Sequence, residues 1–326
     1  MSHTPTSVFT RRDCLTMLTG LSAASFAGGD YRTEAQEARN QRTPYSAPQM
    51  RFGQDIAYLR NAPVCKATRY GQGVPPTCAS KIFVERDGTL HLKTLPFLER
   101  SGWMTRWRSM TKVKLPPLRN PTYSDPDIRA SHASGVILTL QQGAVQREVY
   151  LSNEHHLRNA AWEIEDKAVY DWHYDLGVIS TKEIKPNPED PSLPPRGRLA
   201  DTSVTNGNLC SKSVEVVGFG SDLFKFVGTP FRLPYFVTTP APSVKAPDQQ
   251  HLFFGIKVPG NFLRDIAEIG GMSGSPVVLN GTNEVVGTVC RAYAHRDGDK
   301  PIFIIVFTGP DEVRRIVSRA ENLLER

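Results

Sequence analysis

The chain has 326 residues, with 39 Lys plus Arg against 33 Asp plus Glu and a net charge of +6. A hydrophobic fraction of 39% and a charged fraction of 22% are typical of globular proteins and exclude a chain that is disordered throughout. No apolar run approaches the ~20 residues of a membrane-spanning helix, so we expect no integral membrane protein. The 25 Gly and 25 Pro predict many turns and short strands in place of long helices.

An export signal is predicted at the N-terminus, over residues 1–30. Arg11-Arg12 precedes a mildly apolar stretch, and the stretch ends in Ser-Phe-Ala, a small-x-small cleavage site. The arginine pair and the modest hydrophobicity resemble the bacterial twin-arginine signal, which implies an exported, periplasmic or secreted protein. A disordered cytosolic N-terminus with a chance arginine pair is the alternative. Cleavage after Ala27 would lower the net charge from +6 to +5, and no stable membrane association is expected after processing.

The cysteines that follow the signal are even in number: Cys65, Cys78, Cys210 and Cys290. In an oxidising compartment they can form disulfides, and the sequence alone does not choose among the pairings. Cys65 and Cys78 bracket a loop that contains Gly and Pro, so a disulfide between these two is the favoured pairing. The chain has no CxxC and no HxxxH spacing, and we therefore expect no metal site and no cofactor.

Residues 31–124 are predicted to be an N-terminal extension of unknown role. One hairpin is predicted in this extension, because residues 82–84 and 90–92 are apolar and flank an Asp87-Gly88 turn. Between residues 100 and 114, basic residues alternate with Trp103 and Trp107, a composition that can bind nucleic acid. No nucleic-acid-binding motif accompanies it, so solvated charges at a strand edge are favoured and no nucleic-acid partner is expected.

The rest of the chain alternates between proline-rich stretches and short apolar runs. Proline at this density does not fit central strands, so surface loops are predicted at residues 115–126, 185–195 and 229–247. The apolar runs are residues 135–140, 148–152, 176–180, 214–219, 252–258, 276–279, 285–290 and 302–308. Runs bounded by turn signals, with no helical repeat between them, predict an antiparallel barrel or sandwich. Asn280-Gly281 predicts a hairpin turn, and helical spacing of apolar residues predicts an amphipathic helix after Pro310.

The segment 270–278, Gly-Gly-Met-Ser-Gly-Ser-Pro-Val-Val, carries the strongest chemical signal. Glycines on both sides of Ser273 allow a tight turn that leaves the hydroxyl exposed. The same turn can aim the N–H groups of Gly271 and Ser273 at one point, which makes an oxyanion hole. With the strand, Asn-Gly turn and strand that follow, the segment resembles the nucleophile motif of chymotrypsin-like (trypsin-like) serine proteases. A plain glycine turn is the alternative interpretation.

The resemblance implies a general base and an orienting carboxylate upstream, in the chain order His, Asp, Ser. Residues 149–157, Val-Tyr-Leu-Ser-Asn-Glu-His-His-Leu, resemble the strand-then-histidine segment of the family and imply His155 as base; a register shift of one makes it His156. Residues 173–179, His-Tyr-Asp-Leu-Gly-Val-Ile, resemble its carboxylate segment and imply Asp175, with Asp171 as the fallback. Surface histidines in a turn and a strand-capping aspartate are the structural alternatives.

Two features depart from the family pattern. Only 20 positions separate His155 from Asp175, which is shorter than is common in the family. Met272 stands where many relatives have an Asp that pairs with a freshly cut N-terminus, so this mode of activation is not expected.

By register, the residues that line the primary specificity pocket are Ala267, Cys290, Arg291 and Ala292. None of these is acidic, which favours a small or apolar substrate side chain over Lys or Arg.

The resemblance covers residues 125–326 and implies an all-β fold, a double antiparallel β-barrel of the chymotrypsin-like type with a C-terminal α-helix. It implies an exported serine endopeptidase that acts on a protein or peptide substrate through Ser273, His155 and Asp175, with an acyl-enzyme intermediate. The alternative is a catalytically inactive trypsin-like domain that binds a protein or a wall polymer. The glycines of residues 216–220 are interpreted as serving backbone geometry and not phosphate binding.

Overall fold

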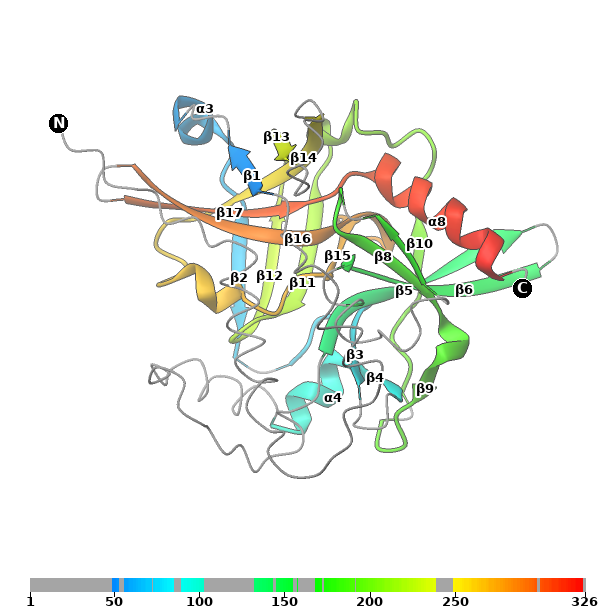
Figure 1. The fold of residues 1–326 in the computed structure, drawn as a ribbon. Coiled ribbons are helices and arrows are strands. Elements are labelled where there is room, and N and C mark those ends of the chain that lie inside the picture. The colour runs from blue at the N-terminus through cyan, green and yellow to red at the C-terminus, as the bar shows by residue number, and fades with distance from the viewer. Residues whose placement is uncertain are drawn as a thin grey trace, which may run out of the picture.

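Strands dominate the computed structural model, and one long helix closes the chain (Figure 1). Each strand is paired with at least one neighbour, and most strands are short, as the many turn signals predict. Within the described part of the chain, no helix is both long and apolar enough to cross a membrane. The structure describes residues 49–52, 56–71, 73–84, 89–102, 132–142, 145–154, 157, 168–171, 173–190, 192–238, 249–297 and 300–324.

The first group of strands surrounds the antiparallel pair β5–β6, whose register runs from Gly135↔Ser152 to Gln142↔Val145. The β3–β4 hairpin pairs with β5, while β8 pairs with both β6 and β7. In order of pairing, the strands are β9 (Ile184–Pro186), β4 (Leu90–Thr94), β3 (Ala79–Val84), β5 (His132–Gln142), β6 (Val145–Ser152), β8 (Leu176–Ser180) and β7 (Ala168–Asp171). This group carries the segments predicted to hold the base and the carboxylate.

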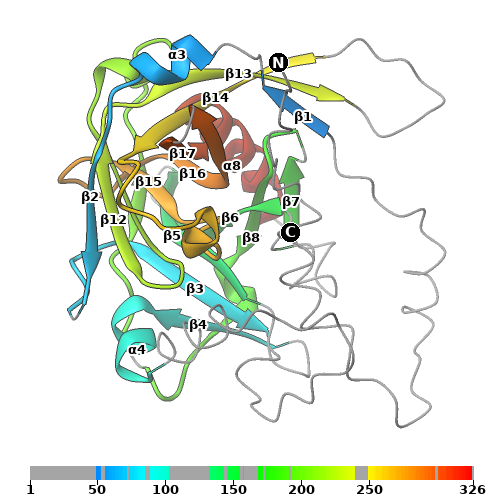
Figure 2. The same cartoon turned by 90° about the vertical axis from the view of Figure 1, so that its left-hand side faces the viewer.

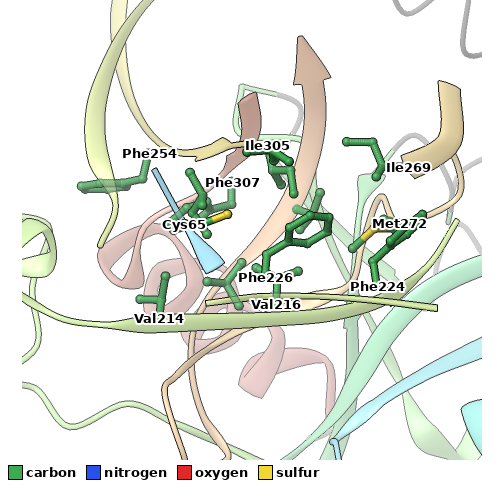
Figure 3. Packing of buried hydrophobic residues seen from close by; sticks show 14 of the residues in the cluster. Cys65, Val214, Val216, Phe224, Phe226, Phe254, Ile269, Met272, Ile305 and Phe307 are labelled. Carbon is green, nitrogen blue, oxygen red and sulfur yellow. The ribbon is translucent and has the colours of Figure 1, made fainter. Parts of the chain in front are cut away.

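The second group of strands is antiparallel throughout. In order of pairing, its strands are β2 (Lys66–Tyr70), β12 (Leu223–Gly228), β11 (Val214–Phe219), β15 (Pro276–Leu279), β16 (Glu284–Asp297), β17 (Lys300–Phe307), β14 (Gln249–Val258), β13 (Phe231–Thr238) and β1 (Gln49–Phe52). Its interior is the largest hydrophobic cluster, in which Phe224, Phe226 and Phe254 pack among Val, Ile and Leu side chains (Figure 3). The predicted nucleophile lies just before β15 and therefore belongs to this group.

Two elements join the groups. Strand β10 (Gly197–Leu199) runs parallel to β5 of the first group and to β16 of the second. Helix α8 (Pro310–Leu324) contacts β7 and β8 of the first group and β16 of the second, and its apolar face packs into a cluster shared by Val136 and Val285 (Figure 1). The shorter helices are α3 (Ile56–Asn61), α4 (Leu95–Arg100), η2 (Thr181–Glu183), η3 (Leu209–Ser211) and η4 (Ile266–Ile269). Figure 2 shows α4 with β3 and β4 at one end of the molecule and α3 with β13 at the other.

The predicted strands and the C-terminal helix are confirmed. All of the predicted apolar runs fall within strands except Thr308, which follows β17, and α8 begins at Pro310. The Asn280-Gly281 turn joins β15 to β16, and Gly281 adopts a φ of +78° that a glycine accepts without strain. Strands β3 and β4 form the predicted hairpin, although residues 85–88 between them lie outside the described residues. The mostly β architecture thus agrees with the all-β prediction.

Two of the proline-rich stretches contain strand residues where surface loops were predicted. Lys185 and Pro186 belong to β9, which pairs with β4, and the stretch 229–247 contains a longer strand. Residues 231–238 form β13, which contains Pro234 opposite Leu252 of β14. The other neighbour of β13 is β1, and its register begins only at Phe52↔Tyr235. The described pairing with β1 does not reach Pro234. The missing N–H of Pro234 therefore removes no hydrogen bond of that pairing. The predicted loop at 115–126 lies outside the described residues, and so do the signal segment and Trp103 and Trp107.

The favoured disulfide is also wrong, because Cys65, Cys78, Cys210 and Cys290 are all free. Cys65 precedes β2 and packs in the interior of the second group, with its Cβ close to Gly228 of β12. Cys78 precedes β3 and packs with Val136 and Leu138 of β5. The two thiols are thus buried in different clusters, even though they bracket one loop in the sequence.

Residues 49–94 supply strands to both groups. Strand β1 pairs with β13, β2 pairs with β12, and β3 pairs with β5. These partners all belong to the segment 125–326 that carries the resemblance to proteases. The predicted boundary near residue 124 lies outside the described residues and stays a prediction.

Candidate active site

Ser273 lies in a turn between η4 and β15 and is partly exposed. The turn is held by backbone hydrogen bonds: Ser275 N donates to Met272 O at 2.9 Å, Gly274 N donates to Val289 O at 2.7 Å, and Val289 N donates to Ser275 O at 2.9 Å. Gly271 and Gly274 have φ values of +93° and +89°, which residues with a Cβ rarely adopt. The glycines that bracket the serine are therefore required by the shape of the turn, as the motif predicts.

Gly274 brings this turn into contact with the first group of strands. A Cβ built on Gly274 would lie 2.0 Å from Ser134 O of β5 and 2.7 Å from Ser152 Oγ of β6. Ser152 Oγ in turn donates a hydrogen bond to Ser134 O. Because Ser152 precedes His155 by three residues, the Ser273 turn lies against the end of the strand that leads to the predicted base.

Asp175 lies at the start of β8 and is 5% exposed. Its carbonyl oxygen accepts hydrogen bonds from Asn153 Nδ2 at 2.9 Å and from Glu154 N at 3.2 Å. Among the described residues it is the one residue other than glycine with a positive φ, at +55°. Aspartate tolerates this left-handed conformation better than most residues, but the conformation still costs about 1 kcal/mol or more and recurs at functional sites. Asp175 is thus fixed against the two residues that directly precede His155.

The charge of Asp175 acts on Cys290 of β16. Burial raises the pKa of the Cys290 thiol, and the negative charge of Asp175 raises this pKa further. Cys290 directly follows Val289, the residue that holds the Ser273 turn through two backbone hydrogen bonds. Backbone hydrogen bonds therefore connect the Ser273 turn to the neighbour of Cys290, and the Asp175 whose charge acts on Cys290 is bonded through its carbonyl to Asn153 and Glu154.

His155 and His156 lie outside the described residues, so the choice between them as base stays a prediction. Their described neighbours are well fixed. Leu157 is fully buried and its N–H donates to Asn153 O at 3.1 Å, while Glu154 is 1% exposed.

The fallback carboxylate, Asp171, is bound to the C-terminal helix. Its Oδ2 lies 2.9 Å from Arg315 Nη2 and 4.0 Å from Arg319 Nη1, and its Oδ1 accepts from His173 N at 3.1 Å. Asp171 is 7% exposed, so this ion pair is largely shielded on the carboxylate side. Asp171 therefore anchors α8 to β7, which leaves Asp175 as the better candidate for the orienting carboxylate.

Met272 is 1% exposed and packs with Phe224 and Ile269 in the interior of the second group (Figure 3). Gly218 of β11 makes room for this packing, since a Cβ there would lie 2.8 Å from Met272 Cε. At Gly220 a Cβ would lie 2.2 Å from Glu268 O. These close approaches confirm that both glycines serve backbone geometry. They also show that the apolar side chain of Met272 fills a buried position.

The residues predicted to line the specificity pocket are found near the Ser273 turn. Ala267 belongs to η4, which leads into the turn, and Cys290, Arg291 and Ala292 belong to β16. Cys290 is 2% exposed and its thiol donates to Val306 O at 3.3 Å, so its side chain points into a hydrophobic cluster with Phe253. A bulge between Val289 and Arg291 shifts the register of β16 against β17 at this point. The pocket assignment itself stays a prediction.

One residue beside the turn escapes the sequence analysis. Lys81 of β3 is 1% exposed, and its Nζ donates to Gly271 O at 2.9 Å and to Phe219 O at 3.4 Å. Ser134 Oγ also donates to Gly271 O, at 2.9 Å. Lys81 directly precedes the apolar run 82–84 of the predicted hairpin, and a lysine at such a place normally indicates a solvent-facing position.

Within the described ranges, no group of three or more His, Cys, Asp or Glu side chains converges as metal ligands would. Comparison with known proteins finds neither a family model nor a curated protein that matches this chain.

Proposed function

We propose that this protein is an exported serine endopeptidase with a chymotrypsin-like double β-barrel, in which Ser273, His155 and Asp175 form the catalytic triad. The observation that carries the proposal is the contact between three segments that are distant in sequence. The Ser273 turn lies against Ser134 and Ser152, and the Asp175 carbonyl is bonded to Asn153 and Glu154. Both sets of contacts converge on the residues that directly precede His155.

The two groups of strands support the double-barrel part of the proposal. The base and carboxylate segments belong to the first group, and the Ser273 turn belongs to the second. A site at the junction of two β units has its groups supplied by strand ends and turns that rigid pairing holds in place. In this arrangement each barrel would supply part of the triad.

In the proposed reaction, Ser273 Oγ attacks the carbonyl carbon of a peptide bond while His155 takes the hydroxyl proton. The negative charge that develops on the carbonyl oxygen is stabilised by the N–H groups of Gly271 and Ser273. His155 then donates the proton to the leaving amine, which leaves an acyl-enzyme on Ser273. Water, deprotonated by His155, hydrolyses the acyl-enzyme and releases the acid. Asp175 keeps the imidazole in the required tautomer and stabilises its protonated form.

The burial of Asp175 suits this role. A carboxylate that is 5% exposed lies in a poorly screened environment, where its attraction to an imidazolium is stronger than in water. Its fixed backbone limits the positions that the carboxylate can adopt. Both properties are those of an orienting group in a triad.

A fluorophosphonate probe tests the proposal, because it reacts only with an activated serine. The wild-type chain is expected to be labelled at Ser273, and Ser273→Ala is expected to lose labelling. Ser211→Ala, which changes an exposed serine of η3, is the matched control and should label as wild type does. Equally weak labelling of wild type and Ser273→Ala in folded protein would mean that the protease proposal is wrong and would favour the binding-module alternative.

The base is tested in the same assay. His155→Ala is expected to abolish labelling, whereas His156→Ala is expected to retain most of it. The opposite result would move the base to His156, and equal labelling of both variants would contradict a histidine base in this segment.

A further inference from the structure

The side chain of Lys81 is buried inside the protein and points at the Ser273 turn. In β3 the alternate residues Ala79 and Phe83 pack in a hydrophobic cluster with Phe219. Lys81 lies between them on the same face, because side chains two apart in a strand share a face. Its Nζ lies 5.9 Å from the centre of the Phe219 ring and donates to two backbone carbonyls. Burial of an amine is costly, so such a position calls for a specific role.

The carbonyl of Gly271 receives donors from two different strands. Lys81 Nζ approaches from β3 and Ser134 Oγ approaches from β5, each at 2.9 Å. A carbonyl oxygen has two lone pairs, so both hydrogen bonds can form at once. Gly271 has a φ of +93° and, as a glycine, can adopt many other backbone conformations. The two donors therefore favour one conformation of a residue whose backbone tolerates many.

We propose that Lys81 is a positioning residue that holds residues 270–275, the oxyanion loop, in the conformation needed for catalysis. This inference rests on the proposed function, because the loop is named for its expected oxyanion donors. Fixing the carbonyl of Gly271 limits how the peptide on its other side can turn, and that peptide carries the Gly271 N–H. Lys81 thus acts on the oxyanion hole through the backbone and without contact to the substrate.

The hydrogen bonds of Lys81 do not depend on its charge. Burial lowers the pKa of Lys81 to about 7. The charge of Lys81 helps to lower the pKa of the buried His132 of β5. A neutral amine still has two N–H donors, so Lys81 can bond both carbonyls in either protonation state.

This arrangement has a consequence for activation. Met272 is apolar and buried, so the loop has no carboxylate at that position to pair with a newly formed N-terminus. Lys81 supplies a donor from within the chain, on a strand that is already paired with β4 and β5. The loop would then be ordered on folding, without a proteolytic cut, and residues 79–84 would belong to the active protein and not to a discarded propeptide.

The test measures the rate of fluorophosphonate labelling per active site in the full chain. Lys81→Met keeps the length of the side chain and removes the donors, and its labelling rate constant is expected to fall ~100-fold, as for loss of an oxyanion-hole donor. The fraction of protein labelled at saturation should stay near that of wild type, whereas a merely structural role would lower the fraction and not the rate. Lys81→Arg, which keeps N–H donors, should recover part of the rate. Lys93→Met on β4 is the matched control and should label as wild type does.

Several outcomes would overturn the inference. A wild-type rate constant for Lys81→Met would remove the positioning role while leaving the protease proposal intact. Absence of labelling in folded wild type would remove both. If Lys81→Met fails to fold, Ser134→Ala, which removes the other donor to Gly271 O, must slow labelling at least 10-fold, and an unchanged rate would refute the role of this carbonyl. A labelled wild-type species that lacks residues 79–84, as shown by its mass, would contradict the inference directly.

Discussion

Replacing Gly274 with Ala tests whether the Ser273 turn lies against the first group of strands. The substitution adds a Cβ 2.0 Å from Ser134 O, a backbone atom of a paired strand. Real Cβ atoms essentially never lie within 3.0 Å of such an atom, so the turn and β5 must separate by about 1 Å. Gly281→Ala is the matched control, because Gly281 also has a positive φ, +78° against +89°, but has nothing within 4 Å of the added Cβ.

The expected magnitudes follow from this difference. Both variants force alanine into a left-handed conformation, which costs about 1 kcal/mol in the free energy of unfolding. Gly274→Ala adds the cost of overpacking, about 1–3 kcal/mol, and should lose about 2–4 kcal/mol in total. A displacement of about 1 Å near the reacting atoms costs on the order of 100-fold in rate. We therefore expect Gly274→Ala to slow fluorophosphonate labelling ~100-fold and Gly281→Ala to leave it unchanged.

Urea denaturation gives the free energies of unfolding, and the time course of labelling gives the rates. Equal destabilisation of the two variants would show that Ser134 does not restrict the turn. A normal labelling rate in a clearly destabilised Gly274→Ala would show that the contact is structural only. Either result would refute the reasoning that connects the two groups of strands through this turn.

Other predictions follow from single residues of the site and the core. Asp175→Asn keeps a side chain that tolerates positive φ but removes the charge, so thermal unfolding should change little while kcat falls about 10⁴-fold; a loss of less than 10-fold would exclude the triad role. Asp171→Asn should instead lower the free energy of unfolding by about 1–3 kcal/mol and keep the labelling rate, because it breaks the ion pair to α8. Lys81, with a pKa lowered to about 7 from 10.5, binds fewer protons in the folded chain than in the unfolded chain between these pH values. The free energy of unfolding of wild type relative to Lys81→Met should therefore rise with pH above 7, by up to about 1.4 kcal/mol per pH unit, and parallel curves would contradict the burial of a lysine. Because Cys65 and Cys78 are free, dithiothreitol should leave the melting temperature unchanged, and a drop of several degrees would indicate a disulfide.

Much of the fold could be predicted because local signals and tertiary structure agree. The run 214–219 is apolar except at Glu215, and β11 is buried at every position. The Asn280-Gly281 pair needs only local backbone geometry to form its turn, and the spacing of Val313, Ile316 and Val317 is that of one helix face. In each case the local structure is determined by residues that are close to one another in the sequence.

The errors arise where a residue's structure depends on a partner that is distant in sequence. Pro234 is tolerated in β13 because β1, from the other end of the chain, begins to pair only one residue later. Cys65 and Cys78 are close in sequence, but each joins the core next to a different strand, β12 and β5. Proline content and cysteine spacing do not reveal these partners.

Lys81 illustrates the same limit at the candidate site. Alternation in β3 would place a lysine on a solvated face, but both faces of this strand are covered: Ala79 and Phe83 join one hydrophobic cluster and Ile82 joins another. The motif around Ser273, by contrast, is visible in sequence because the turn needs glycine at two positive-φ positions within four residues. A glycine-framed turn can thus be predicted from local geometry, whereas a donor that is 190 residues away in the chain cannot.

The burial of Met272 and that of Lys81 can be understood together. A carboxylate at position 272 would lie in a cluster with Phe224 and Ile269, where it would need a cation to offset its desolvation. With methionine there, the apolar side chain stabilises the turn by packing, and the carbonyl of Gly271 is the polar group that still needs hydrogen-bond donors. Lys81 and Ser134 supply these donors, and both are parts of the folded chain before any cut is made. A chain that carried Met272 without a donor at position 81 would leave this carbonyl with one side-chain donor, and Lys81→Met creates that chain. Its labelling rate therefore decides whether packing by Met272 alone is sufficient to order the loop.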